Sequence, residues 1–198
     1  FSVTHFSPHI ALFVEEINSG GKTQKYYSTT SELHRFYSDL VSRMDTTASP
    51  ELRALVADIT QGLSDRDKAK AIYYWVQNNI KYVAYSDGYM GFIPVPPSEV
   101  FSKRFGDCKG MAGLINKMME LAGLQSCLAW VGTRHIPYTY GEMPLPGADK
   151  HMVTAYIKGD STLIMDGTFT WLDFGVYPYH IQEKEVLISL EKDKYRIF

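Results

Sequence analysis

The sequence predicts an α+β fold in which helices come first and an antiparallel sheet follows. Apolar residues recur at helical spacing through 31–122, and short runs of β-forming residues follow over 126–166. Glycine and proline gather mainly in residues 86–97, 132–147 and 166–178, which we expect to be loops. Helices followed by hairpin-forming strands are the usual order of an α+β domain.

Three helices are expected before the first of these loops, over about residues 31–43, 49–62 and 64–80. The second begins with Ser49, which can cap a helix, and Pro50, whose fixed backbone angle suits the first turn. Each helix carries apolar residues three and four positions apart, so we expect one face of each to pack into the core.

Two more helices are expected after that loop. Pro97 opens a short helix that runs to about Lys103, and a longer helix starts at Cys108 and stops at Gly123. A Gly-Asp pair precedes the longer helix, and its aspartate can cap the first turn.

Three strands are expected next, over residues 126–133, 152–158 and 162–166. Gly159 and Asp160 fit a hairpin turn between the second and the third. These two strands should therefore pair antiparallel.

Composition limits the classes of partner. The chain has 198 residues, of which 45% are hydrophobic, so it can form a core without a metal or a disulfide. Its 20 Lys and Arg against 22 Asp and Glu give a net charge of −2. Because no overall positive field exists to attract phosphates, nucleic acid is excluded as a partner and a peptide, protein or small-molecule substrate is expected.

No segment is long and apolar enough to predict a membrane span, since Glu120 and Gln125 interrupt the most apolar stretch, 118–131. The chain begins with Phe1, and no basic start followed by an apolar run resembles a secretion signal. We therefore expect it to be part of a longer protein.

The two cysteines occupy unlike settings. Cys127 lies in an apolar strand, where a small buried hydrophobic residue is expected. Cys108 starts a helix, where unpaired N–H groups and the helix dipole favour the thiolate, and Lys109 adds a positive charge. Gly106 and Gly110 would leave room for a substrate. Local context alone fits a nucleophile and a structural cysteine equally well.

A cysteine nucleophile needs a base, and His151 is the best placed of the six histidines because it opens a strand. His135 and His180 lie in loops and could approach a cleft without acting as its base. The remaining three are expected to be surface or local packing residues: His5, His9 and His34.

Asp166 is the expected partner of His151. A turn near residue 159 lies halfway between them, so antiparallel pairing brings the two residues together. Taken alone, Asp166 followed by Gly167 also fits an ordinary turn.

The segment Gly106–Gly110 (Gly-Asp-Cys-Lys-Gly), with Lys81–Val83 upstream and His151 and Asp166 downstream, resembles the transglutaminase-like superfamily of papain-fold cysteine enzymes. It is most similar to the bacterial branch with a Gly-Asp-Cys-Lys motif. The resemblance covers about residues 50–170. It implies that Cys108 is the nucleophile, His151 the base and Asp166 the group that orients the base.

The resemblance also implies a papain-like core in which helices pack on an antiparallel sheet. We expect a catalytic domain over residues 50–198, with residues 1–49 as its N-terminal strand and helix extension. A bacterial periplasmic or secreted location is the expectation that the resemblance favours.

Two positions depart from the family pattern. Lys150 stands where many relatives have Asn or a small residue, and Gly167 replaces a common Pro. Neither removes a catalytic group. No acidic loop suggests the calcium site of animal transglutaminases, so we expect no metal and no cofactor.

Tyr82 is a candidate second donor to an oxyanion, beside the backbone N–H of Cys108, although it also fits a plain strand aromatic. Aromatic residues crowd the loops around the expected site, and Tyr85, Tyr89 and Trp171 are candidate walls of a substrate groove. The same loops also contain Met90 and the aromatic residues Phe92, Tyr138, Tyr140 and Phe174.

The expected function is cysteine-dependent acyl transfer on a peptide bond or glutamine carboxamide, through a thioester. Water as the second nucleophile gives a protease or amidase, and an amine gives a transglutaminase. The sequence leaves both open. The alternative is a catalytically inactive peptide-binding or scaffolding module of a larger protein.

Overall fold

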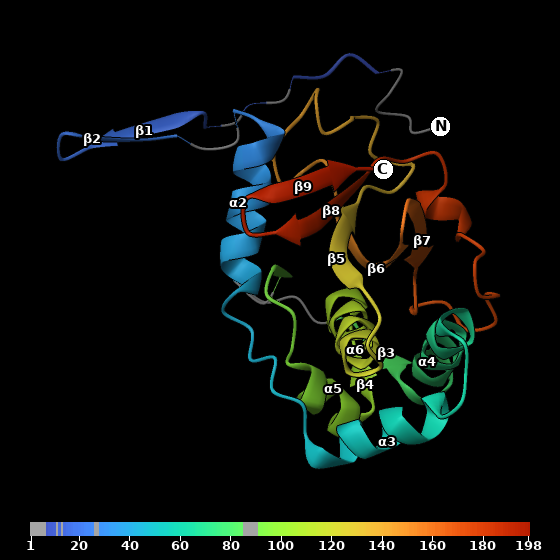
Figure 1. Ribbon diagram of the computed structural model, residues 1–198. Coiled ribbons are helices and arrows are strands. Elements are labelled where there is room, and N and C mark those ends of the chain that lie inside the picture. Colours follow the sequence, from blue (N-terminus) through green and yellow to red (C-terminus); the bar gives the residue numbers. More distant parts are fainter. Residues whose placement is uncertain (1–6, 11, 13, 26–27, 85–90) are drawn as a thin grey trace.

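A five-stranded antiparallel sheet forms the upper half of the fold in Figure 1. The computed structural model describes residues 7–10, 12, 14–25, 28–84 and 91–198. The sheet has the strand order β7-β6-β5-β8-β9. Its strands are β5 (Ser126–Val131), β6 (His151–Lys158), β7 (Ser161–Met165), β8 (Val186–Glu191) and β9 (Lys194–Ile197).

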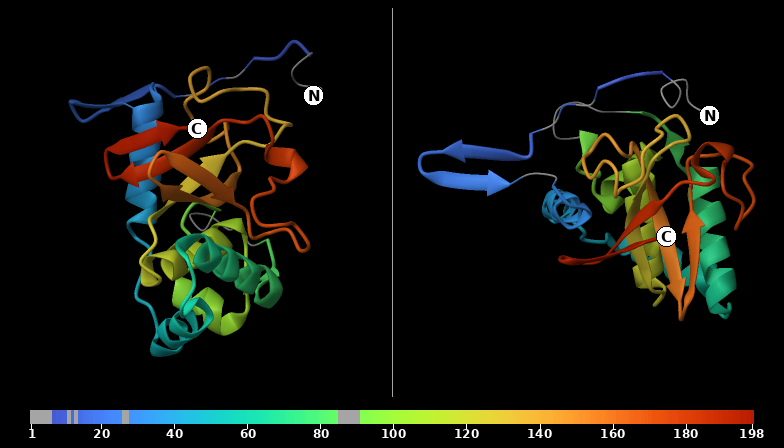
Figure 2. Two further views of the ribbon diagram at one scale, coloured as in Figure 1. Left: turned by 45° about the vertical axis from the view of Figure 1, so that its right-hand side comes forward. Right: turned by 90° about the horizontal axis from the view of Figure 1, so that it is seen from above.

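The helices gather below and beside the sheet. They are α2 (Thr30–Val41), α3 (Pro50–Thr60), α4 (Asp65–Asn79), α5 (Pro97–Lys103) and α6 (Cys108–Leu121). Four begin after a side chain that accepts a hydrogen bond from the backbone N–H three residues later: Thr29, Ser49, Ser64 and Asp107. In both views of Figure 2, α6 lies between α2 and α4. The predicted α+β fold is confirmed.

One face of the sheet packs against the helices. Trp130 on β5 and Met152 on β6 share a buried cluster with Leu33 and Tyr37 of α2. The hydroxyl of Thr154 on β6 donates to the Ala112 carbonyl of α6 at 2.9 Å, and this bond fixes α6 against the sheet. The start of α6 is thereby held beside the start of β6.

The opposite face of the sheet is covered by a loop that contains a short 3-10 helix, η2 (Tyr179–Ile181). Ile181 packs there against Val153, Ile164 and Ile188. This loop brings His180 to the end of the sheet at which β6 begins.

The structure contains further strands beyond the three that the sequence predicts as runs of β-forming residues. β8 and β9 complete the sheet, and the two-residue strands β3 (Lys81–Tyr82) and β4 (Phe105–Gly106) pair in parallel. The Val83 N–H donates to the Gly106 carbonyl at 2.9 Å, which ties the segment after α4 to the residues before α6. Runs of two residues carry no periodicity, so a sequence pattern cannot reveal them.

An N-terminal hairpin precedes α2. It consists of β1 (Glu16–Ser19) and β2 (Lys22–Lys25), and it projects away from the rest of the fold in Figures 1 and 2.

Cys127 is half-buried rather than fully buried as expected. β8 pairs with β5 only over Ala129–Val131, so β8 does not cover the first residues of β5. Burial still raises the pKa of the Cys127 thiol, which therefore stays protonated at neutral pH.

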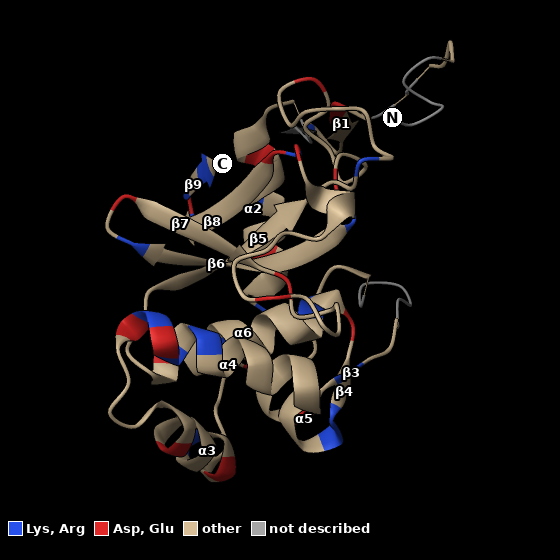
Figure 3. Ribbon diagram, turned by 90° about the vertical axis from the view of Figure 1, so that its right-hand side faces the viewer, with Lys and Arg blue, Asp and Glu red and all other residues tan. Residues whose placement is uncertain are grey.

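The charged surface mixes both signs. In Figure 3, α4 carries acidic and basic residues side by side. Among the described residues, no helix combines the length and the apolar character that a membrane span needs.

Candidate active site

Cys108 occupies the first position of α6 and is buried. The Asp107 carboxylate caps this helix by accepting from the Gly110 N–H at 2.9 Å, and its other oxygen forms a buried ion pair with Lys109. Lys109 is thus already paired within the site. The Cys108 thiol lies where unpaired N–H groups and the helix dipole stabilise negative charge.

Gly106 and Gly110 have a packing role that differs from the expected opening for a substrate. A β-carbon at either position would lie 3.1 Å from a methyl group of Val100 on α5. The two glycines therefore allow α5 to approach the start of α6 closely.

His151 and Asp166 meet at the ends of β6 and β7. Thr154 pairs with Met165, and the same register places Asp166 opposite Val153, two residues from His151. The Nε2 atom of His151 lies 2.7 Å from Oδ2 of Asp166. The other carboxylate oxygen accepts from the Thr168 N–H at 3.0 Å and from its hydroxyl at 2.6 Å. Asp166 is therefore fixed from both sides.

The side chain of Cys108 also acts on His151 and raises the pKa of its imidazole. Burial acts to lower the pKa of His151, but the hydrogen bonds with Asp166 and Cys108, and the charges of both groups, outweigh it and raise that pKa to about 10. Burial likewise acts to raise the pKa of Asp166, but the bonds from His151 and Thr168 hold it below its ordinary value. These interactions favour the protonated, imidazolium form of His151.

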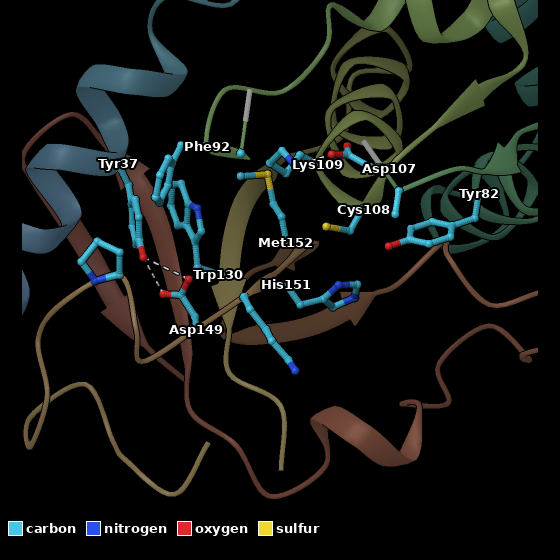
Figure 4. Close-up of a pocket in the computed structure, with 14 residues that line it drawn as sticks. Tyr37, Tyr82, Phe92, Asp107, Cys108, Lys109, Trp130, Asp149, His151 and Met152 are labelled. Carbon is cyan, nitrogen blue, oxygen red and sulfur yellow. Dashed lines mark hydrogen bonds and ion pairs between the residues drawn. The ribbon is translucent and has the colours of Figure 1, made fainter. Parts of the chain in front are cut away.

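Two cavities adjoin these residues. The first, of about 170 Å³, runs from Cys108 to Asp149, and Figure 4 shows its lining side chains. The second, of about 610 Å³, is lined by the loop residues Thr133, Thr168 and Phe169, among others. Three residues border both cavities: Tyr82, Lys150 and His151. A substrate peptide that occupies both cavities would therefore pass His151 at the point where the two cavities meet.

Tyr82 lies at this junction with 46% of its surface exposed. In Figure 4 its hydroxyl points toward Cys108 and His151. Burial, followed by the negative charges of Cys108 and Asp107, raises the pKa of Tyr82, so its O–H remains a hydrogen-bond donor.

The aromatic residues that were expected near the substrate groove differ in their exposure and in whether they line a cavity. Trp171 is 91% exposed and lines neither cavity. Tyr85 and Tyr89 lie outside the described residues. Phe92 lines the first cavity, whereas Tyr140 is buried behind it.

Sequence reasoning missed Asp149. Its carboxylate accepts from the Tyr37 hydroxyl at 3.0 Å and from the Tyr140 hydroxyl at 3.0 Å. The one feature of the sequence that could have indicated Asp149 is its position two residues before His151. Nothing in the sequence indicated that Tyr37, 112 residues away, would join it.

The sequence predicts His180 in a loop that could approach a cleft, and in the structure its ring lies against that of His151 with 5.2 Å between centroids. Burial and then the positive charge of His151 lower its pKa, so it is neutral at pH 7. His151, Asp166 and His180 offer ligand atoms within 4.8 Å of one another and could together hold a metal ion. Such an ion would occupy the same His151 and Asp166 atoms that form the pair described above.

Comparison with known proteins gives a family and several relatives. The model of the transglutaminase-like superfamily matches residues 53–161, which is more than half of the chain and includes Cys108 and His151. The human kyphoscoliosis peptidase is 25% identical over 134 residues, which are 67% of this chain and 20% of that protein. The chain thus spans about a fifth of the length of this relative.

Solved structures were also compared with this chain, and one of them shares its fold at low sequence identity. A candidate protease from Parabacteroides distasonis superposes with a TM-score of 0.64 at 12% identity, over 97% of this chain and 36% of that one. The periplasmic domain of TgpA from Pseudomonas aeruginosa gives a TM-score of 0.44 at 14% identity, over 77% of this chain and 52% of that one.

The family match covers the helix that begins at Cys108 and the strand that begins at His151. The α+β fold observed here agrees with that match and with the resemblance drawn from the Gly-Asp-Cys-Lys motif. The chain therefore belongs to the transglutaminase-like superfamily.

Proposed function

We propose that this chain catalyses acyl transfer from amide bonds through a thioester on Cys108. The observation that carries the proposal is the position of His151, which is hydrogen-bonded to Asp166 and lines the same cavity as Cys108 (Figure 4). A nucleophile, a base and a group that orients the base are the three parts that such chemistry requires.

In the proposed first step, the Cys108 thiolate attacks the carbonyl carbon of a peptide bond or a glutamine carboxamide. The backbone N–H of Cys108 and the hydroxyl of Tyr82 donate to the developing oxyanion. The His151 imidazolium then gives its proton to the departing nitrogen, so that an amine or ammonia leaves and the acyl group stays on sulfur as a thioester. Asp166 holds the imidazole in position throughout.

In the second step, neutral His151 takes a proton from water or from an amine as either one attacks the thioester. Water yields a carboxylic acid, and an amine yields a new amide. In both cases the Cys108 sulfur leaves as a thiolate. His151, which has taken the proton, is again an imidazolium. The enzyme thus returns to its starting state without a cofactor.

The substrate in this proposal is a peptide or protein, because the two cavities meet at His151 and can receive the chain on either side of the reacting amide. The periplasmic or secreted location remains a prediction from the resemblance.

Mass spectrometry of the intact protein after brief incubation with a peptide library tests the proposal. We expect an acyl adduct on Cys108 with the wild type and none with Cys108→Ala. Addition of a primary amine or of ¹⁸O-labelled water then shows which nucleophile releases the acyl group. A folded wild-type protein that forms no adduct with any peptide would instead favour the inactive binding module.

A further inference from the structure

The first cavity contains a carboxylate that the proposed chemistry does not use. We infer that Asp149 binds a primary ammonium group at the end of an alkyl chain, such as a lysine-type side chain of the substrate. This inference rests on the proposed function, and it names the substrate class of the same site.

Asp149 has hydrogen-bonding capacity that its neighbours among the described residues do not fill. Its side chain is buried and accepts from two hydroxyl groups, those of Tyr37 and Tyr140, whereas a carboxylate offers about four acceptor positions. Within the described ranges, no Lys, Arg or His nitrogen lies within the 4.0 Å of an ion pair with this carboxylate. Lys109 is paired with Asp107, and Lys150 is exposed.

The residues that hold Asp149 are themselves fixed. Tyr37 stacks on Trp130 with 4.7 Å between ring centroids. The backbone N–H of Tyr140 donates to Glu185 at 2.8 Å, and its carbonyl accepts from the Thr30 hydroxyl at 3.1 Å. A carboxylate held by anchored partners is organised in advance to bind a ligand.

The walls of this cavity suit an alkyl chain. Figure 4 shows Asp149 at the end formed by Tyr37, Trp130 and Phe92, while Cys108 lies toward the other end. Aromatic faces can cover methylene groups and attract a cation near their surface. The volume of about 170 Å³ is below that of a site for a drug-sized molecule, so a single side chain fits better than a folded segment.

The protonation behaviour of Asp149 is consistent with a positively charged ligand. Burial raises the pKa of Asp149 to about 7, although the hydrogen bonds from Tyr37 and Tyr140 oppose that rise. An ammonium group beside the carboxylate would favour its ionised form and replace the lost solvation.

A structural role for Asp149, as a link between α2 and the start of β6, is the competing explanation. Two variants separate the roles. Asp149→Asn keeps an oxygen that can accept from the tyrosines but removes the charge. Tyr37→Phe removes a hydrogen bond to Asp149 but leaves the charge in place, and it serves as the matched control.

The test measures how fast Cys108 reacts with alkyl methanethiosulfonates. Pairs of reagents of equal length carry either a terminal ammonium or a neutral methyl group, and peptide mass mapping follows Cys108 apart from Cys127. At about pH 8 we expect the cationic-to-neutral rate ratio to fall on the order of tenfold in Asp149→Asn, for the chain length that reaches Asp149. In Tyr37→Phe most of the ratio should remain.

A ratio that is the same in the wild type and in Asp149→Asn, at every chain length, would overturn the inference while leaving the proposed function intact. Slow reaction of Cys108 with the neutral reagents as well would count against the proposed function itself, and with it against the inference. The neutral reagents therefore distinguish the two failures.

Discussion

The imidazole of His151 and the carboxylate of Asp166 lie 2.7 Å apart, and both side chains are almost fully buried. The ring nitrogen engaged by Asp166 is Nε2, and Cys108 also acts on this imidazole and raises its pKa. A buried carboxylate in this position fixes both the orientation of the ring and the location of its protons. Several measurable consequences follow from this pair and its surroundings.

Replacement of Asp166 by Asn should slow acyl transfer by about 10²–10⁴-fold, because the charge that stabilises the His151 imidazolium is lost while the shape is kept. The measurement is kcat/KM for thioester formation, with circular dichroism to check folding. Thr168→Val is the matched control, since it removes one bond to Asp166 but keeps the carboxylate. Equal rates for wild type and Asp166→Asn would show that the pair does not assist the chemistry.

The charge of His151 should make stability depend on pH. Because its pKa rises from about 6.5 in the unfolded chain to about 10 in the fold, its stabilising contribution is complete below pH 6.5 and is lost as the pH rises toward 10. Urea unfolding of the wild type and of His151→Gln measures this effect. We expect the advantage of the wild type to shrink between about pH 6.5 and pH 10. A difference that does not vary over this range would contradict the assigned charge.

Tyr82→Phe should lower kcat by about 10–100-fold with little change in KM, since the hydroxyl is proposed to bond only the developing oxyanion. Stability should change by less than about 0.5 kcal/mol, because nearly half of the side chain is exposed. Trp171→Ala is the control on an exposed aromatic that lines neither cavity, and we expect unchanged kinetics. An increase in KM for Trp171→Ala would instead restore it as a groove residue.

Asp149→Asn should stabilise the fold at high pH. The pKa of Asp149 is raised in the fold to about 7, so ionisation favours the unfolded chain as the pH increases from about 4 to about 7. The groups that face it are the hydroxyls of Tyr37 and Tyr140, and Lys109 and Lys150 line the same cavity.

The gain in unfolding free energy is expected to be on the order of 1–4 kcal/mol at pH 8 and to diminish toward pH 4. Denaturant melts of both proteins at several pH values provide the comparison. A variant that is less stable than the wild type at pH 8 would show that Asp149 has a net stabilising role.

Local signals in the sequence were sufficient for much of the fold. Ser49, Ser64 and Asp107 cap the helices that their sequence contexts predicted, because capping depends only on residues within one turn. The hairpin centred near residue 159 likewise placed Asp166 beside His151, since strand register over so short a connection follows from counting residues.

Contacts between distant segments could not be predicted in the same way. Asp149 gains its partners from α2 and from a loop, and His180 reaches His151 only because η2 covers the outer face of the sheet. These placements depend on tertiary packing rather than on local pattern. The strands β8 and β9 illustrate the same limit, because β8 joins the sheet beside β5, more than fifty residues earlier in the chain.

The central claim is that His151 activates Cys108, and the rate of Cys108 alkylation by iodoacetamide as a function of pH tests it most directly. We expect wild-type Cys108 to react at pH 6 at least about tenfold faster than a free cysteine peptide, and we expect this advantage to disappear in His151→Ala. Cys127, read out in the same digest, serves as the internal reference. A wild-type Cys108 that reacts no faster than the free peptide, or equally fast without His151, would contradict the account.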